Sequence, residues 1–136
     1  VETTGIQSTV CGPESFTPDH KPLVGFHPEM QGYFLACGMN SMGIMLSGGL
    51  GREMAQWINK GSAELDLFSY DISRFHSDCV GDKDWVQQTS HESYAKTYSI
   101  VHPNDEHMAG RSVRRSALHD ALLERGCVFQ QRHGFE

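Results

Sequence analysis

The residues best suited to chemistry lie between Gly38 and Gly51, where five of fourteen residues are glycine. The segment follows an apolar run that predicts a short strand, and it precedes a run that predicts a helix. Glycine permits positive φ and close approach of the backbone to a ligand, and a helix N-terminus offers unpaired N–H donors with partial positive charge. The pattern therefore predicts a site for an electron-rich ligand edge. It is equally typical of a turn that is tightly packed for fold reasons alone.

A second segment, Cys11–Gly25, is stiffened by three prolines. Its Thr17-Pro18-Asp19 sequence predicts a defined turn that Asp19 caps. Neither G-x-G-x-x-G nor G-x-x-x-x-G-K-[ST] occurs in the chain, so the two common phosphate-binding loops are not expected here.

These segments need elements to hold them. Runs at 23–25 and 33–37 predict two short buried strands. After Gly51, one apolar face predicts a helix that ends at Gly61, and its members are Leu50, Met54, Trp57 and Ile58.

Two more helices are expected further along the chain. One spans about 82–98, with a packed side to which four residues could contribute: Trp85, His91, Tyr94 and Tyr98. The other begins at an N-cap, Ser116, carries Leu118 and Leu122 on one face, and ends near Gly126. Val128-Phe129 predicts the start of a strand.

Composition excludes some function classes. The formal net charge of −6 argues against a general nucleic-acid binder, and no apolar run is long enough for a membrane span. The basic cluster Arg111, Arg114 and Arg115 is expected to be solvated or salt-bridged. The four cysteines form no C-x-x-C pair and are expected to be reduced thiols of an intracellular protein, and no histidine pair has zinc-site spacing.

Together, the segments Gly12–Leu23 and Gly38–Ile44 resemble the closing part of the FAD fold in the amine oxidase and dehydrogenase family that includes D-amino-acid oxidase and glycine oxidase. Within that family, the chain is most similar to the branch that demethylates sarcosine and dimethylglycine. The likeness continues through four further runs: Tyr70–His76, Ser90–Lys96, Ala109–Arg111 and Gly126–Gly134.

The resemblance implies that backbone around Pro13 lies near the flavin. It also implies that the pyrimidine edge of the ring is surrounded by five residues: Asn40, Ser41, Met42, Gly43 and Ile44. A helix N-terminus directed at that edge would favour flavin reduction. The catalytic residues are left open, and no metal is expected.

The implied reaction is oxidation of the N-methyl group of sarcosine by FAD, which releases glycine. Electrons would leave through an electron-transfer flavoprotein, and tetrahydrofolate or water would capture the one-carbon unit. The family also implies the mitochondrial matrix as the location.

The implied fold class is α+β, the C-terminal end of an FAD-binding amine oxidase-like fold followed by a small linking domain. Residues 1–62 would close the oxidoreductase domain, 63–110 would form the central linking domain, and 111–136 would open an aminomethyltransferase-like folate domain. The chain is thus expected to be an internal fragment that, on its own, neither binds FAD tightly nor oxidises sarcosine.

Two positions depart from related oxidases. Met45 stands where they place a carboxylate-binding lysine, so that role must lie elsewhere. Cys11 lies about one residue from a cysteine that carries covalent flavin in some of them, and it is expected to be a buried, unreactive thiol. Three further interpretations stay open: a dimethylglycine-specific enzyme, a non-catalytic regulatory subunit of pyruvate dehydrogenase phosphatase that shares the architecture, and an independent small binding module.

Overall fold

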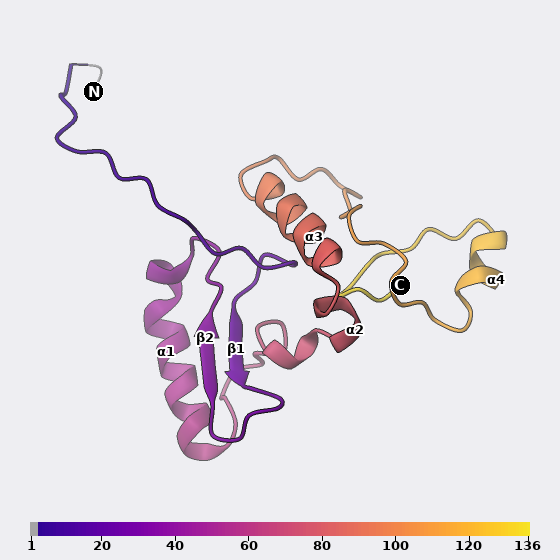
Figure 1. Ribbon diagram of the computed structural model, residues 1–136, viewed down its shortest axis with the longest axis horizontal. Coiled ribbons are helices and arrows are strands. Elements are labelled where there is room, and N and C mark those ends of the chain that lie inside the picture. The colour runs from indigo at the N-terminus through magenta and orange to yellow at the C-terminus, as the bar shows by residue number, and fades with distance from the viewer. Residues whose placement is uncertain (1–2) are drawn as a thin grey trace.

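The computed structural model describes residues 3–136, and its mixture of helices and strands agrees with the expected α+β class. In chain order, the elements are β1 (Leu23–Phe26), β2 (Phe34–Cys37), α1 (Gly43–Lys60), the 3₁₀ helix η1 (Ile72–Arg74), α2 (Ser77–Val80), α3 (Lys83–Lys96) and α4 (His119–Glu124). Figure 1 shows α1 beside the β1–β2 hairpin, α2 and α3 on the other side of β1, and an N-terminal arm that extends away from the body.

Both predicted strands are formed, and they pair as an antiparallel hairpin in which Val24 is opposite Ala36. The expected burial holds for Val24 and Gly25 of β1, but β2 is half-buried to exposed. The side chain of Trp57 packs with its edge against Phe26 and Phe34, at centroid distances of 6.2 and 5.5 Å. On the other edge of β1, the Val24 amide donates to the carbonyl of Tyr70 at 2.9 Å. The segment before η1 therefore covers that edge, which would otherwise be open to pairing with another chain.

The expected start of the first long helix was wrong, because α1 begins at Gly43 and not after Gly51. Gly48, Gly49 and Gly51 are helical residues on exposed parts of α1, where an added Cβ would meet nothing within 4 Å. The predicted end is confirmed: Gly61 has φ 84° and its amide donates to the Trp57 carbonyl. Glu53 is buried and accepts from the amides of Glu64 and Leu65, which ties the end of α1 to the following turn.

The predicted helix near 82–98 is confirmed as α3, with Asp82 accepting from the amides of Asp84 and Trp85 at its start. Its expected packed side was wrong except for Trp85. The buried row is Trp85, Thr89 and Ser93, spaced four residues apart, whereas His91, Tyr94 and Tyr98 are exposed. Small polar side chains fit here because each makes a hydrogen bond, which a count of apolar residues overlooks.

The last part of the chain departs most from expectation. The N-cap of α4 is Leu118 and not Ser116, although Gly126 has the expected left-handed conformation. The predicted strand at Val128-Phe129 is not formed. Instead, the chain closes through isolated bridges between Phe135 and two arginines, Arg114 and Arg132.

The expectation for the basic cluster is confirmed, because Arg111 binds Glu136 at 2.6 Å, Arg115 lies 3.5 Å from Asp120, and Arg114 lies over the ring of Phe135. Cys79 is a buried free thiol, and the other three cysteines are exposed free thiols. Within residues 3–136, no helix has the length and apolar character required to cross a membrane.

Candidate functional site

The bend between β2 and α1 has an unusual backbone. Gly38, Asn40 and Ser41 have φ values of 61°, 50° and 62°, in the left-handed region. Glycine occupies that region freely and asparagine enters it more readily than most residues. At Gly38 a side chain is also excluded by space, since a Cβ would lie 2.8 Å from the Cγ2 of Thr17.

The Asn40 side chain fastens this bend to the second segment. Asn40 is 1% exposed, and its Oδ1 accepts from the Thr17 amide at 2.9 Å and from the Thr17 hydroxyl at 3.3 Å. Its Nδ2 donates to the carbonyl of Gly38, and its own amide donates to that of Ser15 at 3.2 Å. The structure therefore brings the two predicted segments together, with the Asn40 side chain directed into the protein as a clamp.

The other residues of the bend remain accessible. Met42 is the N-cap of α1, its side chain caps no amide, and no acidic residue lies in the first turn. Among the described residues, the amides of Gly43, Ile44 and Met45 have no hydrogen-bond partner, as expected for a helix start. Ser41 is exposed, and Ile44 is 96% exposed.

This arrangement fits a planar ring with an electron-rich edge. Three free donors and the positive end of an 18-residue helix lie at a bend where Ser41 and Ile44 are exposed and Met42 and Gly43 are half-buried. The residues present thus meet the chemical requirement of a flavin pyrimidine edge.

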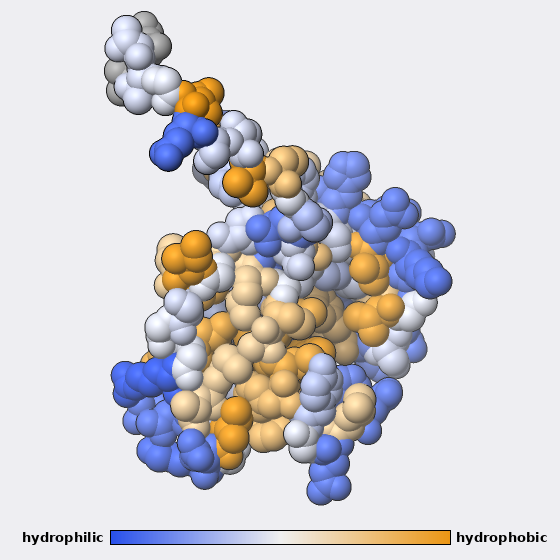
Figure 2. Space-filling model, turned by 60° about the vertical axis from the view of Figure 1, so that its left-hand side comes forward, coloured by the Kyte–Doolittle hydropathy of each residue, from blue (hydrophilic) through white to orange (hydrophobic). Residues whose placement is uncertain are grey.

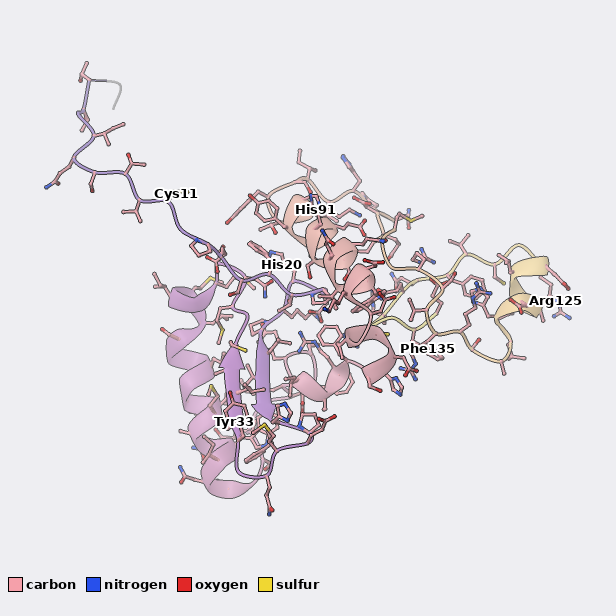
Figure 3. All side chains as sticks on the ribbon, in the orientation of Figure 1. Cys11, His20, Tyr33, His91, Arg125 and Phe135 are labelled. Atoms are coloured by element: carbon pink, nitrogen blue, oxygen red, sulfur yellow. The ribbon has the colours of Figure 1, made fainter. Side chains whose placement is uncertain are left out.

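Pro13 is exposed and lies two residues before Ser15, whose carbonyl accepts from the Asn40 amide. Cys11 lies further out on the N-terminal arm (Figure 3) and is exposed, so the expectation of a buried thiol was wrong. Residues 3–15, which form the described part of the arm, are all exposed. Met45 is 75% exposed and offers no charge to a substrate carboxylate.

Asp19 does more than cap its own turn. Its carboxylate accepts from the Thr17 hydroxyl and the Lys21 amide, as predicted, at 3.3 Å each. It also forms a two-pronged ion pair with Arg74, whose Nε and Nη2 lie 2.8 and 2.9 Å from its oxygens. The side chain of Arg74 is fully buried. Its guanidinium also donates to the carbonyls of Tyr70, Asp71 and Lys21.

Two other elements hold the same loop. The Ser93 hydroxyl of α3 donates to the Pro18 carbonyl at 2.7 Å, and His133 Nε2 lies 3.5 Å from Asp19. Burial lowers the pKa of His133, and the charges of Arg74, Lys21 and Arg132 add to that effect while Asp19 opposes it. Arg74, Ser93 and His133 were missed as positioning residues, because partners 55 and 75 positions apart leave no local pattern.

The family described as "FAD dependent oxidoreductase" matches residues 2–57, and "FAD dependent oxidoreductase central domain" matches residues 60–116. The chain belongs to the FAD-dependent oxidoreductases.

Within that class, the whole chain is 60% identical to "Sarcosine dehydrogenase, mitochondrial" of Homo sapiens over 136 residues. It is 35% identical over 136 residues to "Pyruvate dehydrogenase phosphatase regulatory subunit, mitochondrial" of Mus musculus. It is 30% identical over 131 residues, 96% of the chain, to "Dimethylglycine dehydrogenase, mitochondrial" of Rattus norvegicus. In each case the chain spans about 15% of the length of the curated relative.

Proposed function

We propose that this chain closes the flavin-binding domain of a longer enzyme that oxidises sarcosine to glycine with FAD. The observation that carries the proposal is the bend at Asn40–Ile44, whose free amides and uncovered surface suit the flavin edge. The 60% identity to sarcosine dehydrogenase over the whole chain favours sarcosine among N-methylated substrates.

When bound, FAD would supply the redox chemistry by accepting a hydride from the N-methyl carbon. The residues of this chain would position and polarise the ring. Ser41, Met42, Gly43 and Ile44 would line its pyrimidine edge, where the α1 amides stabilise negative charge. Asn40 would act indirectly by holding the bend on Thr17, and Pro13 would approach the ring from the arm.

We also propose the domain organisation and the partners of the longer protein. Residues 1–62 would end the oxidoreductase domain, and residues 63–110 would form the central linking domain. Residues 111–136 would begin a folate domain that passes the one-carbon unit to tetrahydrofolate. Electrons would go to an electron-transfer flavoprotein in the mitochondrial matrix. The mitochondrial names of the relatives support a mitochondrial location.

Exposed apolar side chains support a larger parent molecule. Ile6 and Val10 of the arm and Ile44 of α1 are 84%, 91% and 96% exposed. Figure 2 shows a face on which apolar groups gather in the centre and charged groups lie at the rim. Such surfaces are usually covered by further protein or by a ligand.

The substrate assignment is tested by dye reduction with the whole protein. Sarcosine should reduce the dye with a higher kcat/KM than dimethylglycine. The reverse preference would favour a dimethylglycine dehydrogenase. No reduction by either substrate would favour a non-catalytic role like that of the phosphatase regulatory subunit, and the enzyme proposal would be wrong.

The assignment of the flavin site can be tested by introducing a negative charge at the start of α1. Gly43→Asp would place a carboxylate among the free amides, and we expect a more negative flavin midpoint potential and slower reduction by substrate. Gly51→Asp is the matched control, since it lies on the same helix but roughly 12 Å further along the axis. That distance exceeds the screening length of about 8 Å in physiological salt. Equal potentials in the two variants would contradict the site.

A further inference from the structure

A hollow in the protein is lined by none of the residues of the Asn40–Ile44 bend. Its volume is about 340 Å³, and four separate segments line it: the loop at Pro18, Asp19 and Lys21; α3 at Thr89 and Glu92; the turn at His107 and Ala109; and the run Gln131, Arg132 and His133. We call it the α3 cavity. Nothing in the proposed flavin chemistry uses it.

The two acids of the α3 cavity are already neutralised. Asp19 is paired with the Arg74 guanidinium at 2.8 Å. Glu92 accepts from the amides of Met108 and Ala109, the latter at 2.7 Å, and from Lys96 at 3.1 Å. Burial alone would raise the pKa of Glu92, but these donors outweigh it and hold the pKa below its usual value. Both carboxylates therefore already have hydrogen-bond and ion-pair partners.

The cationic groups of the α3 cavity are less committed. Within residues 3–136, the Lys21 ammonium forms no ion pair. Arg132 donates to its neighbour's carbonyl at 3.2 Å, and it lies 3.9 Å from Glu106 at a largely exposed position. His107 and His133 add two imidazoles, whose nitrogens lie 3.6 Å from Glu92 and 3.5 Å from Asp19. Because Arg74 and Lys96, which do not line the cavity, already pair with its two acids, the charges of Lys21 and Arg132 are the least balanced in it.

The cations also converge from distant parts of the chain. Lys21 belongs to the loop after Thr17, His107 to the turn after α3, and Arg132 and His133 to the closing run. The charges of Lys21 and Arg132 both act on His133, so these groups share one electrostatic environment. Donors that surround a small polar hollow from several directions suit a compact anion with several acceptor oxygens.

We propose that the α3 cavity binds a small oxyanion carrying two negative charges, such as a phosphate group or a dicarboxylate. Lys21 and Arg132 would provide fixed positive charge, and His107 and His133 would add to it when protonated. The site is independent of the flavin site, so either proposal can fail without the other.

The test is a calorimetric titration of the whole protein with sulfate, a dianion whose charge is constant across the neutral range. Lys21→Gln and Arg132→Gln should each weaken binding about tenfold, as expected for loss of one charge-assisted hydrogen bond. The matched control is Arg125→Gln. Arg125 is also an exposed arginine, but it lies at the far end of α4 (Figure 3), and its loss should change nothing.

A pH series adds a second readout. Sulfate affinity should rise as the pH falls from 8 to 5.5, and His133→Asn should reduce that rise, because a bound dianion favours the protonated imidazole. Titration with inorganic phosphate and with succinate then separates the two sources, and tighter binding of either one supports an oxyanion site. The proposal would be overturned by the absence of saturable sulfate binding, or by equal effects of Arg125→Gln and Arg132→Gln.

Discussion

Asn40 combines two demands that few residues meet together. Its backbone occupies the left-handed region, and its buried amide group both accepts and donates hydrogen bonds. Alanine adopts the left-handed conformation poorly, and its side chain can make no hydrogen bond. The shape of the bend before α1 therefore depends on this side chain more than on the glycines around it.

Asn40→Ala should lower the free energy of unfolding by about 2–4 kcal/mol, since it leaves the buried Thr17 amide unpaired and adds left-handed strain. Hydrogen exchange at the Thr17 amide gives the local readout and should accelerate strongly. Asn104→Ala is the matched control: Asn104 has φ 67° but is exposed, so only the backbone strain is added. If the two variants lose equal stability, the hydrogen bonds of Asn40 do not matter.

Arg74 is a second residue whose geometry cannot be exchanged. A lysine could keep the charge, but its single ammonium group could not donate two hydrogen bonds to Asp19 and also bond to three backbone carbonyls. We expect Arg74→Lys to destabilise the protein by roughly 3 kcal/mol, because a buried pair is broken. Arg52→Lys, at the exposed pair with Glu64, should change stability by less than about 1 kcal/mol. Urea denaturation of both variants decides the matter, and similar midpoints would refute the claim.

At the scale of elements, α1 shows why glycine content misled the sequence analysis. The glycine-rich run predicts a turn, yet four of its five glycines are helical. The helix forms because Leu50 and Glu53 are buried on one face, and this tertiary support outweighs the low helix propensity of glycine on the other faces. Only Gly38 serves as the predicted turn glycine.

Gly110 offers a prediction about how α3 is anchored. It has φ 63°, its carbonyl accepts from the indole of Trp85 at 3.0 Å, and an added Cβ would lie 2.5 Å from that indole nitrogen. Gly110→Ala should therefore shift or separate α3 and cost about 3 kcal/mol or more in stability. Gly126→Ala shares the left-handed backbone (φ 80°) but meets no atom, and about 1 kcal/mol is expected. Thermal melting of both variants is the measurement, and equal shifts would show that the contact with Trp85 is unimportant.

At the scale of the whole molecule, the sequence was informative about local elements and poor about what joins them. The hairpin, the end of α1 at Gly61 and the Asp19 turn follow from patterns within a few residues. The Asp19–Arg74 pair and the Ser93–Pro18 bond connect positions 55 and 75 apart, and polar pairing at such distances has no periodicity to detect. The flavin-edge residues 40–44 were named together because the resemblance to the amine oxidase family implies them, and no local pattern alone would single them out.

His133 makes the joint between the closing run and the Asp19 loop sensitive to pH. Burial, aided by three nearby positive charges, lowers its pKa from the usual 6.5. The unfolded chain therefore takes up the proton more readily than the folded one. The stability associated with neutral His133 is fully present above pH 6.5 and falls as the pH drops through the lowered folded value. The pKa values of the carboxyls of Glu92 and Glu136 are also lowered, and these groups act below about pH 4.5.

The interval between pH 6.5 and 4.5 thus isolates the histidine. We expect the melting temperature to fall by roughly 2–4 °C more in the parent protein than in His133→Asn between pH 7 and 5. Asparagine is the chosen replacement because position 133 has φ 51°. His102→Asn, at an exposed position, should leave the pH profile unchanged. If the His133→Asn profile is parallel to that of the parent, the imidazole is not the group that loosens this joint in acid.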